Sequence, residues 1–203
     1  MSKANIVSQF SLNKTQVEKI DSYLSSLTIY NKHTNLIGKS TIENIWERHV
    51  LDCLQLTKHI TNKKSKILDL GTGAGLPGIL LSIAGFQRVL MVDSAKKKTD
   101  FVRKTIKELS LTAKIQNKRI EKPPTSQYDI IVSRALAPLT KLLTYARMYS
   151  NKNTTSLFLK GRNATGEIDI AAKVYFFEIE KIKSLSSDDG CILKINNIRN
   201  KNG

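Results

Sequence analysis

The segment DLGTGAGLPG, residues 69–78, decides the fold of this chain. It overlaps the short apolar run ILDL at 67–70 and leads into a second apolar segment, 79–84, that has the pattern of a helix. Glycine allows the backbone to take positive φ angles and lets a ligand approach the chain closely. A buried parallel strand, a glycine-rich loop and a helix in this order predict an α/β fold that binds a small molecule at the loop.

After this loop the chain alternates between strand patterns and helix patterns. The expected strands are 67–70, 88–93, 113–115, 128–132 and 157–159, and the expected helices are 79–84, 96–109 and 139–149. Segments 176–184 and 192–198 are expected to close the sheet as an antiparallel pair. Because strands joined by helices run parallel with right-handed crossovers, we expect a doubly wound, mostly parallel, seven-stranded sheet.

The residues before this sheet have a helical pattern. An apolar stripe at three- and four-residue steps is formed by Val17, Ile20, Leu24 and Leu27. Asn13 and Gln16 have the spacing of a capping box, which predicts that a helix begins there. We therefore expect an N-terminal helical region at 1–62, followed by one α/β domain at 63–203.

A second helix is expected to begin at Ser40, with Glu43 completing a capping box, after a loop at 31–38. Its apolar face would consist of Ile42, Ile45, Trp46, Cys53 and Leu56. His49 has the spacing of this stripe, so we interpret it as a structural residue that faces the α/β domain.

The composition favours a polyanionic partner. The chain has 203 residues with 33 Lys and Arg against 17 Asp and Glu, a formal charge of +16, and nucleic acid is the first candidate partner. Cys53 and Cys191 are far apart and lack the spacing of metal ligands, so we expect neither a disulfide nor a metal. Without a long apolar run, we expect a cytoplasmic protein that does not enter a membrane.

Two cofactors are compatible with the glycine loop. Gly73, Gly75 and Gly78 satisfy the Gly-x-Gly-x-x-Gly pattern of nicotinamide and flavin sites. That interpretation leaves Asp69 unexplained, whereas an acidic residue at the strand end suits the cationic aminoacyl group of S-adenosylmethionine. Asp93 ends the next strand and can accept hydrogen bonds from ribose hydroxyls in either case. The pair at 120–121, Ile and Glu, could bracket an adenine ring.

The substrate is expected to meet the segment SRALAP, 133–138, after the fourth strand. The Asx-Pro-Pro-aromatic tetrad used on exocyclic amines is absent, which favours a ring nitrogen such as guanine N7. This atom is intrinsically nucleophilic, so the enzyme needs mainly positioning and electrostatics. Arg134 and Lys160 are the expected positioning residues. The helix at 96–109 carries cations suited to phosphate contacts: Lys96, Lys97, Lys98, Arg103, Lys104 and Lys107.

Taken together, these motifs resemble the RsmG (GidB) family of bacterial ribosomal RNA methyltransferases. The resemblance rests on RHVLD at 48–52, the loop at 69–78, DSAKK at 93–97, SRA at 133–135 and LKG at 159–161. It implies a class I, Rossmann-like fold, S-adenosylmethionine as cofactor, no metal, and direct SN2 transfer to N7 of guanine 527 in 16S ribosomal RNA. With the loop itself, the expected cofactor contacts are Asp69, Gly71, Gly73, Gly75, Leu76, Asp93, Ile120, Glu121 and Arg134.

The resemblance leaves some points open. The substrate could be naked RNA or the assembled small subunit, and we expect a monomer. The segments 151–154 and 188–191 depart from the family pattern, which puts substrate contacts near the C-terminus in doubt. The alternatives are a non-catalytic RNA-binding module on the same fold and an NAD(P)-dependent oxidoreductase.

Overall fold

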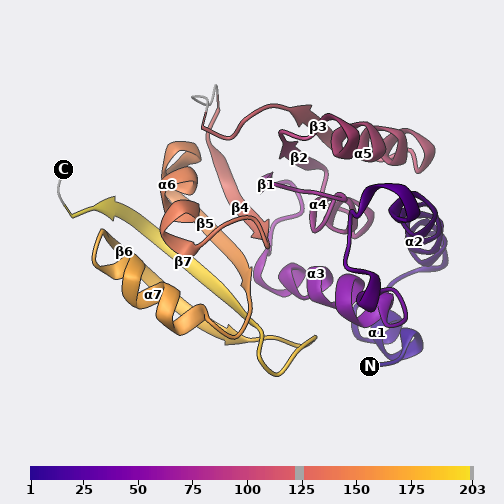
Figure 1. Cartoon of the computed structure of the whole chain (residues 1–203), viewed down its shortest axis with the longest axis horizontal. Coiled ribbons are helices and arrows are strands. Elements are labelled where there is room, and N and C mark those ends of the chain that lie inside the picture. Colours follow the sequence, from indigo (N-terminus) through magenta and orange to yellow (C-terminus); the bar gives the residue numbers. More distant parts are fainter. Residues whose placement is uncertain (122–125, 202–203) are drawn as a thin grey trace.

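A computed structural model describes residues 1–121 and 126–201 and contains one seven-stranded sheet (Figure 1). The strands are β1 (Lys66–Leu70), β2 (Arg88–Asp93), β3 (Lys114–Asn117), β4 (Tyr128–Arg134), β5 (Ser150–Lys160), β6 (Tyr175–Lys183) and β7 (Cys191–Asn200). Their order is β3-β2-β1-β4-β5-β7-β6. The first five strands pair in parallel, whereas β7 runs antiparallel to both β5 and β6. The expected sheet is confirmed.

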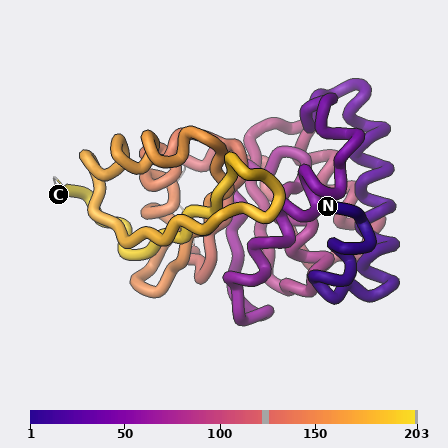
Figure 2. The backbone as a smooth tube through the Cα atoms, turned by 90° about the horizontal axis from the view of Figure 1, so that it is seen from below, coloured from indigo at the N-terminus to yellow at the C-terminus, as the bar shows by residue number. Residues whose placement is uncertain are grey.

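Helices cover both faces of this sheet. They are α1 (Lys3–Gln9), α2 (Lys14–Thr34), α3 (Asp52–Leu54), α4 (Gly78–Ile83), α5 (Lys96–Glu108), α6 (Leu139–Tyr149) and α7 (Ala164–Ala172). The N-terminal helices, α4 and α5 share one hydrophobic cluster, and α6 and α7 belong to a second. Figure 2 shows the two ends of the chain at opposite sides of the molecule, with the N-terminal helices beside the α4 and α5 layer.

The start of α2 is confirmed in atomic detail. The Asn13 side chain accepts the Gln16 backbone N–H at 2.9 Å, and the Gln16 side chain accepts the Asn13 N–H at 3.0 Å. The helix continues to Thr34 and ends at Asn35 in the left-handed conformation, so the loop expected at 31–38 begins later than predicted. The Tyr23 hydroxyl on its buried face donates to the Ala74 carbonyl at 2.9 Å, which ties α2 to the glycine loop.

The continuous helix expected from Ser40 is wrong. The chain forms a 3-10 turn at Lys39–Thr41, a π-helix at Trp46–Leu51, the short α3 and a 3-10 turn at Gln55–His59. Gly38, not Ser40, precedes the first turn, and no side chain caps it. Tertiary contacts outweigh the local pattern here, because the π-helical stretch presents the Arg48 carbonyl to the sheet, where it accepts a hydrogen bond.

The C-terminal part contains one helix that the sequence pattern did not predict. The helix α7 has few buried apolar positions, Ala164 and Ala171 among them, so its periodicity is weak. The strand β5 begins at Ser150, well before the expected start at residue 157. The antiparallel pair β6 and β7 is confirmed.

The described part of the chain bears on the cysteines, on metal-binding groups and on membrane-spanning helices. Both cysteines are buried and free. Within 1–121 and 126–201, no group of three or more His, Cys, Asp or Glu side chains is arranged to hold a metal ion. None of the helices in these ranges is both long and apolar enough to cross a membrane.

Candidate functional site

Asp69 holds the glycine loop in place through two hydrogen bonds of its side chain. Its side chain is fully buried, and Oδ2 accepts the Thr72 hydroxyl at 2.5 Å and the Gly78 backbone N–H at 2.9 Å. Burial raises the pKa of Asp69 to about 7, although these two hydrogen bonds oppose the rise. The carboxylate thus connects the two ends of the loop. Its expected contact with a cofactor stays a prediction.

The glycines of the loop have different tasks. Gly71, Gly73 and Gly75 have φ angles of 67°, 58° and 96°. A Cβ on Gly71 would lie 2.4 Å from a methyl carbon of Leu136, and one on Gly75 would lie 2.5 Å from Ile79. A Cβ on Gly73 would meet nothing within 4 Å, because this residue faces open space. Gly71 and Gly75 therefore allow close packing, whereas Gly73 keeps a cavity open.

Asp93 joins the end of β2 to this loop. Its Oδ2 accepts the Gly73 N–H at 2.9 Å, and its Oδ1 accepts the Ala95 N–H at 2.9 Å. A carboxylate has about four acceptor positions, so both oxygens can still accept ribose hydroxyls. Asp93 lines a cavity of about 180 Å³ together with Ile120 and Glu121.

The two residues beyond β3 are held in place by α6. The Tyr149 hydroxyl donates to the Ile120 carbonyl at 2.8 Å, and the Tyr145 hydroxyl donates to Glu121 at 2.7 Å. The second bond holds the pKa of Glu121 below its usual value. A carboxylate for ribose, an apolar wall and an acceptor for an exocyclic amine thus meet in one cavity, which fits an adenosine group.

Two further cavities continue this site along the carboxyl ends of the strands. The next, of about 300 Å³, shares Gly71 with the first and is lined also by Gly73, Leu76 and His49. The third, of about 330 Å³, shares Arg134 and Ala135 with the second. In this order, we name them the Asp93 cavity, the loop cavity and the outer cavity. Ligands of open α/β sheets bind at this edge.

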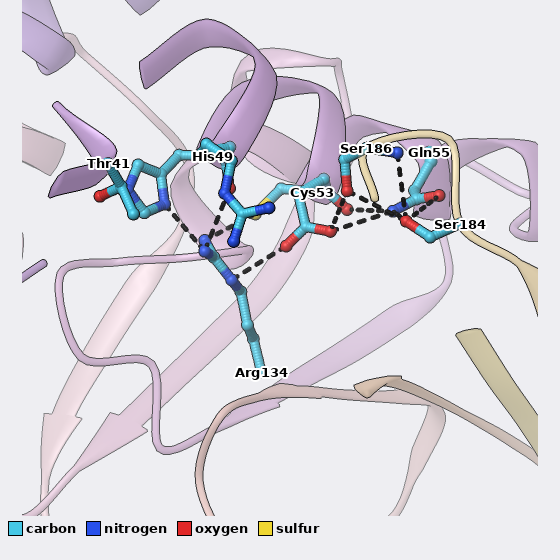
Figure 3. Close-up of polar contacts among 9 residues, drawn as sticks. Thr41, His49, Cys53, Gln55, Arg134, Ser184 and Ser186 are labelled. Atoms are coloured by element: carbon cyan, nitrogen blue, oxygen red, sulfur yellow. Dashed lines mark hydrogen bonds and ion pairs between the residues drawn. The ribbon is translucent and has the colours of Figure 1, made fainter. Parts of the chain in front are cut away.

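Arg134 lines both the loop cavity and the outer cavity. Figure 3 shows this side chain among its contacts, with His49 and Cys53 beside it. Its Nε lies 3.0 Å from Asp52 Oδ2. One terminal nitrogen lies 2.8 Å from His49 Nδ1 and 3.2 Å from the Arg48 carbonyl, and the other lies 3.8 Å from Cys53 Sγ. Asp52 therefore pairs with Arg134 and not with Arg48, although the four-residue spacing of Arg48 and Asp52 would allow a pair on a regular helix.

Neither His49 nor Cys53 has the protonation chemistry of a catalyst. Burial, and then the charges of Arg134 and Arg48, lower the pKa of His49 to about 3. Burial raises the pKa of the Cys53 thiol to about 12, although Arg134 opposes this. At neutral pH the thiol stays protonated and is a poor nucleophile. The site is built for binding and positioning.

Comparison with known proteins shows the family to which this chain belongs. Residues 16–191 match the family model GidB, described as rRNA small subunit methyltransferase G. The chain belongs to this family.

Relatives named ribosomal RNA small subunit methyltransferase G span nearly the whole chain. The one from Cereibacter sphaeroides is 36% identical over 200 residues, covering 96% of this chain and 97% of the relative. The one from Paramagnetospirillum magneticum is 31% identical over 198 residues, covering 98% and 97%. The expected enzyme class, a methyltransferase, is confirmed, and the oxidoreductase alternative is not supported.

Solved structures agree on the fold. A ribosomal protein L11 methylase from Lactobacillus delbrueckii has a TM-score of 0.60 at 18% identity, covering 73% of this chain and 77% of that one. A TehB-like SAM-dependent methyltransferase from Corynebacterium glutamicum has a TM-score of 0.56 at 17% identity, covering 72% and 87%. The expected class I, Rossmann-like fold is confirmed.

In this GidB family member, Lys160 is part of a tight ion-pair cluster. Its Nζ lies 2.6 Å from Glu167 and donates to the Ala137 carbonyl at 2.8 Å. The same Glu167 oxygen accepts the Leu139 N–H at the start of α6, at 2.6 Å. Lys160 therefore fastens β5 to α6 and α7 while it lines the outer cavity. Its expected role toward substrate is untested.

The basic residues of α5 fall into two groups. Lys96 and Arg103 both pair with Asp100, at 2.7 Å and 2.6 Å, and Lys104 pairs with Glu108 at 3.6 Å. Lys97, Lys98 and Lys107 have no carboxylate partner within 4.0 Å in the described part of the chain. Lys98 also lines the loop cavity. Phosphate contacts from this helix remain a prediction, with the unpaired lysines as its strongest members.

Sequence reasoning missed several site residues. Glu167 lies on the unpredicted α7, and Tyr145 fitted the helix pattern without any sign that its hydroxyl meets Glu121. Ser186 donates to Asp52 at 2.6 Å from the loop between β6 and β7. A signal exists for Ser186 alone, because the partly buried carboxylate of Asp52 requires hydrogen-bond donors.

Proposed function

We propose that this chain transfers the methyl group of S-adenosylmethionine to small-subunit ribosomal RNA. The methyltransferase class follows from the family, and S-adenosylmethionine is its cofactor. The observation that carries the proposal is that the three cavities are neighbours with shared lining residues. The Asp93 cavity and the loop cavity share Gly71, and the loop cavity and the outer cavity share Arg134 and Ala135. The methyl donor and the acceptor base would meet beside Arg134.

The residues present fit the cofactor in parts. Asp93 would hold the ribose hydroxyls, and Ile120 and Glu121 would hold the adenine. The backbone of Gly71 and Gly73 would face the aminoacyl part, because a side chain at Gly73 would occupy that space. The bound cofactor supplies an electrophilic methyl group on a sulfonium. A variant of MtNAS, with a TM-score of 0.61 at 16% identity over 92% of this chain and 73% of that one, is solved with S-adenosylmethionine.

The acceptor we propose is N7 of a guanine, the base at position 527 of 16S ribosomal RNA, attacked by direct displacement. A ring nitrogen with a free lone pair carries no proton to remove, so the reaction needs no general base. The protein side agrees with this requirement. His49 Nδ1 is engaged by Arg134, and the Cys53 thiol stays protonated at neutral pH. What the site offers is orientation and exclusion of water.

The formal charge of +16 favours a long polyanion over a small acceptor. Because ribosomal RNA is folded around proteins in the subunit, the assembled particle and the naked RNA present the base differently. A monomer acting in the cytoplasm stays our expectation for the enzyme.

The decisive experiment uses S-adenosylmethionine labelled in the methyl group and small subunits that lack the modification, with deproteinised RNA in parallel. Digestion to nucleosides and chromatography should give label in 7-methylguanosine, and mapping of labelled RNA fragments should place it at one position. Label in another nucleoside would overturn the acceptor. Salt-sensitive RNA binding without any label, at confirmed cofactor saturation, would favour the RNA-binding module.

Asp93→Ala serves as the variant deficient in cofactor binding. Asp129→Ala is its matched control. The Asp129 side chain also accepts a backbone N–H, that of Lys66 at 2.7 Å, but it lies at the amino-terminal end of β4, whereas the site lies at the carboxyl ends of the strands. The proposal requires that the first variant lose labelling at limiting cofactor while the second keeps it.

A further inference from the structure

The hydrogen bonds around His49 have a fixed direction. The Thr41 hydroxyl donates to the Gly38 carbonyl at 2.6 Å, so its oxygen accepts from His49 Nε2, 2.7 Å away. This leaves the proton on Nε2 and the lone pair on Nδ1. Arginine can only donate, so Arg134 requires such a lone pair at 2.8 Å. Both ends of the chain of bonds select the same tautomer.

The surroundings of His49 keep this imidazole neutral. The ring is 3% exposed, and the guanidinium of Arg134 and the charge of Arg48 face it. Asp52, three residues after His49, is paired with Arg134, and the Cys53 thiol is protonated. A second ring proton would point from Nδ1 at the guanidinium and remove the acceptor. These effects together place the pKa of His49 at about 3.

Asp52 supports Arg134 from the other side. Its Oδ2 faces Arg134 Nε, whereas its Oδ1 accepts the Ser186 hydroxyl at 2.6 Å and the Gln55 amide at 3.2 Å. Gln55 in turn accepts the Leu185 N–H at 2.9 Å. Residues of the loop at 184–190 line the outer cavity, so one carboxylate fixes both Arg134 and a wall of that cavity.

We propose that His49 and Asp52 are positioning residues for methyl transfer, which act by holding the Arg134 guanidinium at the junction of the loop cavity and the outer cavity. This rests on the proposed function. The network extends from Gly38 and Thr41 in the lining of the loop cavity to Ser186 in the lining of the outer cavity. It therefore holds the linings of the two cavities in place relative to each other beside Arg134, where the methyl donor and the acceptor base would meet.

Three variants of His49 separate this role from packing. Asn places an acceptor oxygen close to the position of Nδ1 and can keep the bond from Arg134. Gln reaches toward Thr41 and leaves Arg134 without this acceptor, and Ala removes both contacts. A displacement of about 1 Å at a reacting centre costs up to about 100-fold in rate. His33→Asn, at an exposed position on α2, is the control.

We expect kcat to fall by roughly 10- to 100-fold in His49→Gln and His49→Ala. His49→Asn should recover most of this loss, and the cofactor Kd should stay within about 3-fold of wild type in every variant. Equal losses of kcat in all three variants would mean that His49 contributes only through packing. A Kd that weakens more than 10-fold with kcat unchanged would make His49 a cofactor ligand. Either result overturns the proposal.

Nitrogen NMR of the wild-type imidazole tests the network independently of turnover. We expect a proton on Nε2, an acceptor Nδ1, and no titration of His49 between pH 5 and 8. A protonated Nδ1 or a titration in this range would overturn the assigned geometry. If wild type transfers no methyl group but the NMR result stands, the proposed function fails and the network survives as structure.

Discussion

Arg134 at the end of β4 and Asp52 at the start of α3 form an ion pair with Nε and Oδ2 3.0 Å apart. Among the ion pairs of the described residues, it is the one that joins the helical N-terminal region to the sheet. Both side chains are about one-fifth exposed, at 21% and 18%. The pair thus sets how the N-terminal region sits against the cavities, and its loss is expected to be felt in stability as well as in activity.

Asp52→Asn should lower the free energy of unfolding by about 1–3 kcal/mol, because it leaves a partly buried guanidinium without its counter-charge. Urea denaturation measures the change. Asp21→Asn is the control, since the Lys3–Asp21 pair is 44% exposed on both sides and should contribute less than about 1 kcal/mol. Equal losses in the two variants would mean that the Arg134 pair is no more than a surface contact.

Gly73→Ala should separate cofactor binding from backbone strain. Its φ of 58° costs a side chain about 1–2 kcal/mol, and its Cβ would enter the loop cavity. Gly85→Ala is a matched control, because φ is 95°, nothing lies within 4 Å of its Cβ, and it lines none of the cavities of the site.

Both glycine variants should lose similar stability in thermal unfolding, and only Gly73→Ala should weaken the cofactor Kd, by roughly 10-fold or more. This figure corresponds to about 1.4 kcal/mol of lost contact. Unchanged affinity in Gly73→Ala would show that the cofactor does not pass over this residue.

The sequence was sufficient where local pattern and global fold agree. The loop at 69–78, the Asn13–Gln16 cap and most of the strand segments could be predicted, because glycine, capping and apolar periodicity act within a few residues. The stretch 39–59 could not, since its π-helical turn depends on a contact with Arg134 far along the chain. The same holds for Asp52, which pairs with Arg134 from a distant segment and not with Arg48, four residues before it. Pairings between distant segments leave no periodic signal, so Glu167 and Ser186 were also missed.

Asp93→Ala should weaken cofactor binding by about 1–3 kcal/mol, as expected for lost charge-assisted hydrogen bonds. The variant also frees the Gly73 N–H, so part of the effect comes from the loop. Calorimetry should show Asp129→Ala to be unchanged in affinity. An Asp93→Ala protein that binds as tightly as wild type would remove Asp93 from the ribose site.

Asp69 should make the protein less stable as the pH rises from about 4 to about 7. Burial raises its folded-state pKa to about 7, above the ordinary value of 3.8, so the folded protein binds the extra proton in this window. The stabilisation is fully present below pH 4 and is lost once the pH passes 7. Asp69 Oδ1 is buried and has no hydrogen-bond partner among the described residues. A negative charge on this oxygen is therefore poorly compensated.

The melting temperature of wild type minus that of Asp69→Asn should therefore fall across this pH range, because Asn cannot titrate. Subtraction removes the contribution of the other carboxylates. A difference that does not vary with pH would show that Asp69 is charged throughout and that its burial is compensated in some other way.

The unpaired cations of α5 are expected to contact RNA phosphates. Lys97→Glu combined with Lys98→Glu should weaken RNA binding and reduce the slope of log K against log salt by about 1–2, since each phosphate contact contributes about 0.7–0.9 to that slope. The control, Lys64→Glu with Lys152→Glu, changes the net charge equally. Both residues are exposed and lie near the amino-terminal ends of β1 and β5, away from the carboxyl ends that carry the site. This control should keep the wild-type slope and lose affinity only through the overall field. If both double variants show the same slope, RNA responds to total charge and α5 faces away from it. If only the α5 variant changes, the helix that begins beside Asp93 directs the RNA backbone past the mouth of the loop cavity, where Lys98 lies.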